Sequence, residues 1–198
     1  MTMYHGLSAA KMRGDDIVKP LRGTELKRFL RKCERPDLEL HILLADVEDP
    51  VNVGAAFRIA DAVKAASVIL TGITPTPPHK LIDKVGRRKD RKVPWKYVEK
   101  PKEAIDALRD NGCQIVALEL TAEAKPYQNF NFNSQVCIIV GHEDHGVTKA
   151  VLEQVDDAVY IPMYGKGASL NVSVSLGVAC FQVIESVERQ QNVSSPSD

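Results

Sequence analysis

Three short apolar runs in this chain each end in a loop of glycine and polar residues, and this pattern limits the folds open to it. The three segments are HILLADVEDPVNVGAAFR (residues 41–58), VGHEDHG (140–146) and IPMYGKGASLNVSVSL (161–176). Such a pattern is typical of buried strands that deliver backbone and a few polar side chains to a ligand crevice at their carboxyl ends. Three strand ends of this kind in 198 residues predict one composite site.

Further apolar runs alternate with helical segments. Strands are predicted at residues 40–45, 67–71, 115–120, 136–140 and 158–162, and helices at 24–35, 52–63, 101–111, 147–155 and 170–189. Residues 72–100 are expected to form a proline-rich loop and a basic connection. Strands that alternate with helices of about ten residues predict an α/β fold, with a mostly parallel sheet and helices on both faces.

The composition is that of an ordinary globular protein, with 44% hydrophobic and 26% charged residues. We expect residues 1–20 to be disordered, residues 21–190 to form a single domain that includes a short basic N-terminal helix, and residues 191–198 to form a disordered tail. No apolar run approaches a membrane span, and the start, MTMYHGLSAAKMRGDD, has no signal-peptide core. A cytoplasmic location and no membrane partner are therefore expected.

The net charge of zero hides a strong asymmetry. Residues 11–35 carry nine basic and four acidic residues, and residues 79–102 carry ten and three. Two basic segments on an otherwise acidic chain indicate a surface for a polyanion. For either segment alone, a solvated helix face is an equally good interpretation.

Several chemistries are disfavoured by the motifs. DPVNVGAAFR has one glycine where a dinucleotide fingerprint needs three, which argues against a nucleotide-binding oxidoreductase. GKGAS at 165–169 lacks the Ser or Thr that follows the lysine of a P-loop. His142 and His145 have no third ligand cluster nearby in the sequence, and the four cysteines form no CxxC, so no metal is expected.

Polar residues stand at the predicted strand ends, where hydrophobic packing has no use for them. They are Asn52, Arg58, Glu143, Ser169 and Asn171. Each of them alone can be read as a helix cap, a turn residue or a surface residue. Their joint occurrence at one edge of the predicted sheet favours a functional site.

NVGAAFR (52–58), IIVGHEDHG (138–146) and IPMYGKGASLNVSVS (161–175) resemble the three motifs of the SpoU, or tRNA ribose methyltransferase H, branch of the SPOUT superfamily. The resemblance covers about residues 38–188 and holds in order and spacing. It implies a deep trefoil knot in the C-terminal part, a rare exception to the rule against knotted chains. It also implies a homodimer whose final helix contributes to the interface, and transfer of a methyl group from S-adenosylmethionine to a ribose 2′-hydroxyl of RNA.

The resemblance further assigns site residues. The cofactor would be bound by Leu118, Gly141, Ile161, Met163 and Leu170, and the catalytic residues would be Arg58, Asn52, Glu143, Ser169 and Asn171. A guanidinium is a poor base, so we expect Arg58 to stabilise the developing alkoxide and to hold a neighbouring phosphate. Asn52 and Ser169 would position the ribose or Arg58, Glu143 would orient Asn52 or Arg58, and Asn171 would fix the loop.

RNA would lie on basic residues of the two positive segments. They are Arg28, Arg31, Lys32, Arg87, Arg88, Lys89, Arg91 and Lys92. Trp95 could stack on a base, although a core or interface aromatic is the favoured reading. With no room for a separate RNA-binding domain before residue 36, tRNA is preferred to ribosomal RNA. The alternative is a non-catalytic SPOUT-like RNA-binding protein, against which the intact Asn52, Arg58, Glu143 and Asn171 argue.

Overall fold

The computed structural model describes residues 19–167 and 169–194, and the chain divides into two compact units, Met1–Glu34 and Arg35–Asp198. The first unit contains helix α1 (Gly23–Leu30), none of whose residues is buried. Its N-cap is Arg22, no side chain caps it, and it ends at Leu30 rather than at residue 35 as predicted. Residues 1–18 and 195–198, most of the two predicted disordered ends, lie outside the described residues. The single domain expected over residues 21–190 stays a prediction.

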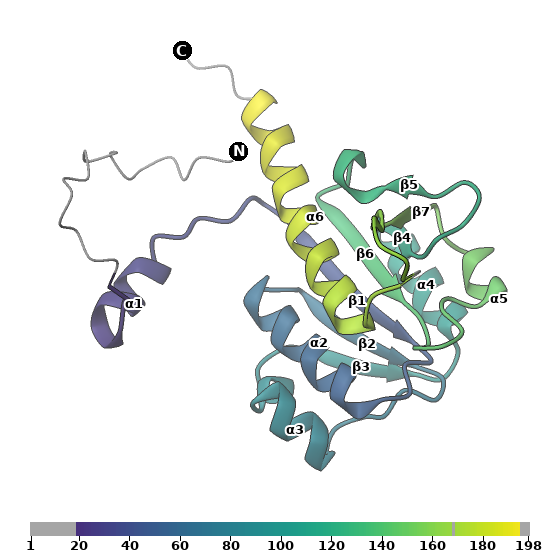
Figure 1. Cartoon of the computed structure of the whole chain (residues 1–198), viewed down its shortest axis with the longest axis horizontal. Coiled ribbons are helices and arrows are strands. Elements are labelled where there is room, and N and C mark those ends of the chain that lie inside the picture. Colours follow the sequence, from purple (N-terminus) through teal and green to yellow (C-terminus); the bar gives the residue numbers. More distant parts are fainter. Residues whose placement is uncertain (1–18, 168, 195–198) are drawn as a thin grey trace. The chain divides into compact units, whose positions relative to one another are not determined.

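The second unit is built on a parallel sheet (Figure 1). Its strands are β1 (Glu39–Ala45), β2 (Ser67–Thr71), β3 (Trp95–Val98), β4 (Gln114–Leu118), β5 (Lys125–Pro126), β6 (Gln135–Val140) and β7 (Asp157–Tyr160). Among the described residues these form one seven-stranded sheet in the order β3-β2-β1-β6-β4-β7-β5, and every pairing is parallel. The predicted parallel α/β fold is confirmed, whereas β3 and β5 were not predicted from the sequence.

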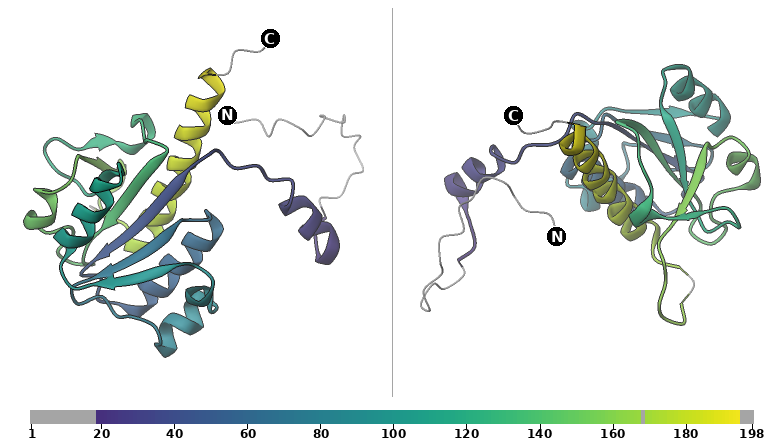
Figure 2. Two further views of the ribbon diagram at one scale, coloured as in Figure 1. Left: turned by 180° about the vertical axis from the view of Figure 1, so that it is seen from behind. Right: turned by 90° about the horizontal axis from the view of Figure 1, so that it is seen from above.

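Helices cover both faces of this sheet (Figures 1 and 2). The helical segments are α2 (Pro50–Ala62), α3 (Lys80–Gly86), the 3-10 turn η1 (Lys89–Arg91), α4 (Pro101–Asp110), the 3-10 turn η2 (Tyr127–Asn129), α5 (Lys149–Leu152) and α6 (Val172–Ser194). One core cluster joins the sheet to α2 and α6, and a second joins its other face to α4 and α5. No helix in the described part of the chain is long and apolar enough to cross a membrane.

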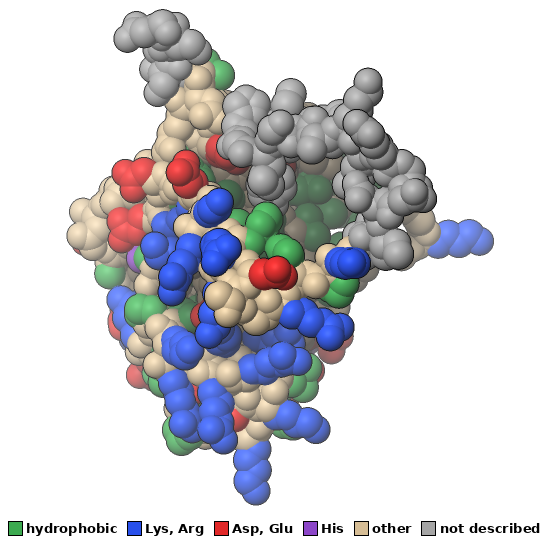
Figure 3. Space-filling view, turned by 90° about the vertical axis from the view of Figure 1, so that its left-hand side faces the viewer, with side chains coloured by type: hydrophobic (Ala, Val, Ile, Leu, Met, Phe, Trp, Pro, Cys, Tyr) green, Lys and Arg blue, Asp and Glu red, His purple; other side chains and the backbone are tan. Residues whose placement is uncertain are grey.

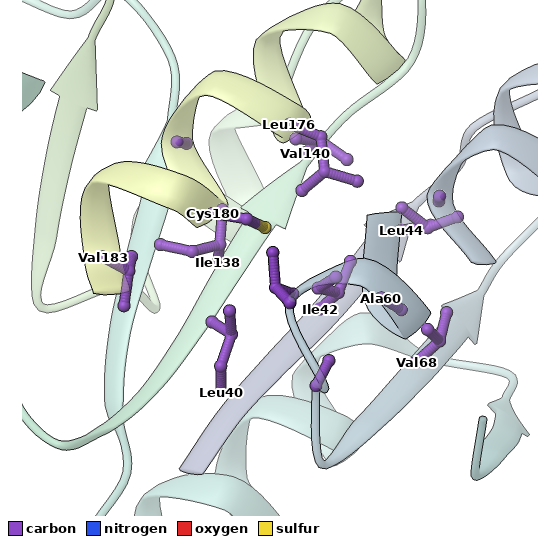
Figure 4. Packing of buried hydrophobic residues seen from close by; sticks show 14 of the residues in the cluster. Leu40, Ile42, Leu44, Ala60, Val68, Ile138, Val140, Leu176, Cys180 and Val183 are labelled. Carbon is purple, nitrogen blue, oxygen red and sulfur yellow. The ribbon is translucent and has the colours of Figure 1, made fainter. Parts of the chain in front are cut away.

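Strand β1 explains why its sequence reads as a continuous apolar run. Successive side chains of a strand point to opposite faces, and both faces of this sheet are covered. Leu40, Ile42 and Leu44 belong to the cluster with α2 and α6, and Figure 4 shows Leu44 on the side of Ala60 of α2. Leu43 belongs to the cluster with α4 and α5.

Helix boundaries differ from the predictions at several places. Asp49, rather than Asn52, caps α2, because its carboxylate accepts a hydrogen bond from the Val51 N–H at 2.8 Å. Helix α6 begins at Val172 rather than at residue 170, and it continues to Ser194, so the predicted tail over residues 191–194 is helical. Helix α5 is confined to Lys149–Leu152, and the predicted connection over residues 72–100 contains α3, η1 and β3.

Trp95, at the start of β3, packs into the core. Its ring meets that of Phe57 edge to face, with 6.4 Å between the ring centroids. It is partly buried against the cluster that joins the sheet to α2 and α6. The core interpretation of Trp95 is confirmed.

Candidate functional site

The strand order brings two of the polar loops together. β1 and β6 are neighbours with Leu44 paired to Val140, so the chain segments that follow them leave the same edge of the sheet. β1 leads through α2 to β2 on one side, while β4 lies on the other side of β6. Ligands of parallel α/β sheets bind at such points, beyond the carboxyl ends of the strands.

Glu143 ties these two loops to each other. Its carboxylate accepts hydrogen bonds from the N–H groups of Glu48 at 3.0 Å and Asp49 at 3.1 Å, and from Nδ2 of Asn52 at 2.8 Å. Partial burial raises the pKa of Glu143, but these hydrogen bonds outweigh burial and hold it below its ordinary value. Glu143 is therefore an anion that fixes both the loop and the amide of Asn52.

Asn52 connects these two loops to the third one, the loop before α6. Its Oδ1 accepts a hydrogen bond from Nδ2 of Asn171 at 3.1 Å. Oδ1 of Asn171 in turn accepts from the N–H groups of Ser173 at 2.9 Å and Val174 at 3.3 Å, so Asn171 caps α6. The chain Glu143–Asn52–Asn171, which we call the amide network, joins the three segments that the sequence singled out.

Two glycines allow the loop after β6 to fold tightly. A Cβ at Gly141 would stand 2.2 Å from the carbonyl oxygen of Gly146, across the bridge that pairs His142 with Gly146. Gly146 has φ +65°, and a Cβ there would stand 2.2 Å from Oε2 of Glu119. Larger residues at either position would therefore push the loop away from β4 and β6.

Glu119 is a site residue that sequence reasoning missed. Its carboxylate accepts hydrogen bonds from the N–H of Val147 at 2.8 Å and from that of Leu120 at 3.0 Å. It thereby holds the Gly141–Val147 loop to the end of β4. In the sequence, Glu119 could have been noticed as the one carboxylate inside the apolar run predicted as a strand over residues 115–120.

The other two predicted catalytic residues lie outside the amide network. Arg58 is exposed on α2, and a helix that turns about 100° per residue directs it about 120° away from Asn52. Ser169 is also exposed and makes no hydrogen bond to another described residue. A catalytic part for either residue stays a prediction.

The residues predicted to bind the cofactor gather at the same sheet edge. Leu118, Gly141 and Ile161 end or directly follow β4, β6 and β7, which are consecutive neighbours in the order β6-β4-β7. Met163 and Leu170, from the loop after β7, are 38% and 40% exposed. Residues 161–167, 169 and 170 make no hydrogen bond to any other residue that the structure describes. This edge therefore offers apolar side chains and free backbone N–H and C=O groups side by side.

His142 and His145 take part in the loop itself. Nδ1 of His142 accepts a hydrogen bond from the Asp144 N–H at 3.1 Å, and its Nε2 lies 3.4 Å from the Glu48 carboxylate. The His145 ring lies over it at 4.7 Å between centroids. Within the described residues, no group of three His, Cys, Asp or Glu side chains is placed to hold a metal ion.

The basic residues predicted to contact RNA differ in what they touch. Arg28, Arg31 and Lys32 belong to the first unit and are exposed. In the second unit, Lys89 pairs with Asp61 at 2.5 Å and Arg91 with Asp83 at 3.7 Å. The remaining three, which make no ion pair with a described residue, are Arg87, Arg88 and Lys92.

A cavity of about 220 Å³ lies at the opposite, amino-terminal edge of the sheet. Among the residues around it is His41, whose Nδ1 is 2.8 Å from the Ser67 hydroxyl. Burial lowers the pKa of His41, and the Glu39 carboxylate offsets part of this effect. None of residues 52–58, 138–146 and 161–175 lines this cavity, so the candidate site rests on the amide network and not on the cavity.

Comparisons with known proteins agree with this geometry. Residues 39–181 match the model of the SpoU rRNA Methylase family. The 23S rRNA (guanosine-2′-O-)-methyltransferase RlmB of Vibrio cholerae is 33% identical over 170 residues, which cover 84% of this chain and 67% of that protein. A putative TrmH family tRNA/rRNA methyltransferase of Staphylococcus aureus is 28% identical over 168 residues, with the same two coverages of 84% and 67%.

Solved structures give the same result. The TrmH/SpoU tRNA modifying enzyme of A. aeolicus superimposes with a TM-score of 0.71 at 27% identity and covers 87% of both chains. An AdoMet-bound rRNA methyltransferase from Sinorhizobium meliloti superimposes with a TM-score of 0.70 at 26% identity over 81% of this chain but only 60% of its own. This chain also spans 64% of the Streptomyces viridochromogenes methyltransferase AviRb. Because the family model matches most of the chain, including all three loops of the amide network, the protein belongs to the SpoU rRNA methylase family.

Proposed function

We propose that this protein transfers a methyl group from S-adenosylmethionine to a ribose 2′-hydroxyl of RNA. The observation that carries the proposal is the amide network, in which Glu143, Asn52 and Asn171 join three distant segments at the carboxyl edge of the sheet. The relative from Vibrio cholerae is named as a guanosine 2′-O-methyltransferase, and the one from Sinorhizobium meliloti was solved with AdoMet bound. Both support the reaction and the cofactor.

The residues at this edge fit the cofactor. An adenosine needs apolar surface for its base together with hydrogen-bonding groups around its rim. Exposed apolar side chains and backbone groups without a hydrogen-bond partner among the described residues stand together after β7, and Gly141 lets the loop after β6 turn tightly at the same edge. Leu118, Gly141, Ile161, Met163 and Leu170 hold the cofactor, in loops that the C-terminal trefoil knot brings together. When bound, the cofactor supplies an electrophilic methyl group on a sulfonium sulfur.

The chain's own side chains act on the ribose. Arg58 stabilises the alkoxide that develops on the 2′-oxygen and holds an adjacent phosphate, because a guanidinium stays protonated at neutral pH and cannot act as the base. The hydroxyl proton leaves to a phosphate oxygen or to water. Asn52, held at both ends of its amide, and Ser169 position the ribose.

The working form is a homodimer. Val174 and Phe181 are 52% and 56% exposed on the outer side of α6, whose inner side carries fully buried residues such as Cys180 and Val183. Large apolar side chains on the open face of a long helix favour coverage by a second copy. Transfer RNA is proposed ahead of ribosomal RNA, because the relative that matches 87% of both chains is named as a tRNA modifying enzyme.

The test is incorporation of labelled methyl groups from S-adenosylmethionine into total tRNA and, separately, into ribosomal RNA, with the modified positions mapped as 2′-O-methyl ribose. We expect label in tRNA, with rates at least about 100-fold lower for Asn52→Ala and Arg58→Ala. Arg109→Lys, on α4 at the other face, should keep the wild-type rate. RNA binding without incorporation would establish the non-catalytic alternative, and a full rate for Arg58→Lys would remove Arg58 from the mechanism.

A further inference from the structure

Helices α2 and α3 approach each other backbone to backbone. A Cβ at Gly54 would stand 2.9 Å from the carbonyl oxygen of Ile82 and 3.1 Å from the N atom of Gly86. A Cβ at Gly86 would stand 3.0 Å from the carbonyl oxygen of Gly54. This contact fixes the C-terminal end of α3 against the first half of α2.

The chain leaves α3 through two arginines in the left-handed backbone region. Arg87 has φ 51° and ψ 40°, and Arg88 has φ 59° and ψ 31°. Residues with a side chain adopt this region at a cost, and glycine or asparagine would adopt it more easily. The turn between α3 and η1 therefore carries two adjacent arginines whose backbone geometry does not favour them, which makes their side chains candidates for a role in binding.

The basic residues of this turn divide into two groups. Lys89 and Arg91 are engaged by Asp61 and Asp83, and these pairs hold η1 against α2 and α3. Arg87, Arg88 and Lys92 are exposed and have no acidic partner among the described residues. Their charges are therefore free for an external anion.

Arg58 lies on the side of α2 that faces this turn. It follows Gly54 by four residues and precedes Asp61 by three, spacings that put all three on one stripe of a helix. Gly54 packs on Gly86 and Asp61 pairs with Lys89, so Arg58 stands between two points at which α2 touches the turn. Figure 3 shows Lys and Arg side chains in the lower part of the view, at the height at which Figure 1 draws α3.

We propose that Arg87, Arg88 and Lys92 form a clamp for the RNA phosphates next to the nucleotide that Arg58 contacts, while Lys89 and Arg91 hold the clamp in position. This inference rests on the proposed function, because it takes RNA as the partner and Arg58 as the residue beside the reacting ribose. It divides the predicted basic segment into residues that bind and residues that support.

The test is the salt dependence of binding to total tRNA. Each phosphate contact contributes about 0.7 to the slope of log affinity against log salt concentration for single strands and about 0.9 for duplexes. The clamp variant combines Arg87→Asn, Arg88→Asn and Lys92→Gln, since asparagine keeps the left-handed backbone without the charge. We expect its slope to fall by about 2 and its affinity at low salt to fall at least tenfold.

The control variant removes the same charge elsewhere. It combines Lys102→Gln, Lys125→Gln and Lys149→Gln, which stand on α4, β5 and α5. Its slope should remain that of the wild type. Equal losses of slope in the clamp and control variants would mean that only net charge matters, and would overturn the proposal.

Single substitutions distinguish residues that bind phosphate from residues that hold the turn in position. Arg88→Asn should lower the slope by about 0.7, whereas Lys89→Gln should lower the melting temperature and leave the slope unchanged. The reverse result would overturn the division into two groups. Titration of each variant with S-adenosylmethionine should give the wild-type affinity. Unchanged salt slopes in a clamp variant that still methylates RNA would refute the clamp alone, whereas absence of methyl transfer by the wild type would refute the proposed function.

Discussion

Glu143 is the residue through which the loop after β1 meets the loop after β6. It accepts hydrogen bonds from the backbone of Glu48 and Asp49 and from the side chain of Asn52. Hydrogen bonds to a charged acceptor are stronger than those between neutral groups, and they require the carboxylate form. The geometry of the amide network should therefore depend on the ionisation of this one side chain.

Glu143→Gln should lower the free energy of unfolding by about 1–2 kcal/mol at pH 7, because an amide cannot accept all three hydrogen bonds. The folded-state pKa of Glu143 lies below its ordinary value of 4.5, so the stabilisation is complete above that pH and is lost as pH falls through the folded-state pKa. The difference in the free energy of unfolding between wild type and variant should therefore disappear as the pH is lowered. Urea unfolding of both proteins from neutral pH down to about pH 3.5 measures it.

Glu153→Gln is the matched control, because it removes the same charge from an exposed pair with Lys149 on and just after α5. Such pairs contribute at most about 1 kcal/mol. A difference in unfolding free energy between wild type and Glu143→Gln that stayed constant down to the lowest pH would contradict an anionic role.

The sequence predicted Glu143, Asn52 and Asn171 as site residues because polar side chains at strand ends stand out. Glu119 stood out only as a carboxylate inside an apolar run, and the sequence does not show that it binds the N–H of Val147, 28 residues away.

At the scale of elements, the segment over residues 72–100 was the hardest to predict. Helix α3 has seven residues and β3 has four, and their surfaces carry many lysines and arginines. Short elements give too few turns or alternations for a periodic pattern, and the basic residues hid the buried Ile82 and Val93. The position of α3 depends on a contact with Gly54, about 30 residues earlier, that no local pattern records.

Gly54→Ala tests this contact. Alanine in a helix interior is ordinarily more stable than glycine by up to about 1 kcal/mol. Here the new Cβ would meet the Ile82 carbonyl oxygen at 2.9 Å and Cβ of Val85 at 3.0 Å, so α3 would have to move. Overpacking of this kind costs about 1–3 kcal/mol, and we expect the free energy of unfolding to fall.

Gly177→Ala is the control, and we expect it not to lower the free energy of unfolding. Gly177 is inside α6, and its nearest neighbour to a new Cβ would be Cδ1 of Ile59 at 3.7 Å, an ordinary contact. This variant should be as stable as the wild type or up to about 1 kcal/mol more stable. If Gly54→Ala were stabilising to the same extent, the close approach of α2 and α3 would be refuted.

At the scale of the whole molecule, the sequence predicted the layers of the second unit better than its strand order. Alternation of strands and helices is enough to predict a parallel sheet with two covered faces, and five of the seven strands could be recognised as apolar runs. The order β3-β2-β1-β6-β4-β7-β5 depends on which strands pair across the chain, as β1 does with β6. That order decides which loops meet. The alternation of strands and helices was enough to predict one composite site at the carboxyl edge, but not that β1 and β6 are neighbours there.

The last prediction concerns association of the whole chain. Phe181→Glu should convert the proposed dimer to a monomer in sedimentation velocity, because a charge would be buried opposite the same charge at a two-fold interface. Phe181 is 56% exposed and follows Val174 by seven residues, so both stand on one side of α6, while the core is made by residues on the other side. The monomer should consequently remain folded. Leu81→Glu places the same charge at an apolar residue that is 42% exposed on α3, and it should leave the sedimentation coefficient unchanged. A Phe181→Glu protein that sediments as the wild type does would exclude this face of α6 from the interface and leave its exposed apolar residues without an explanation.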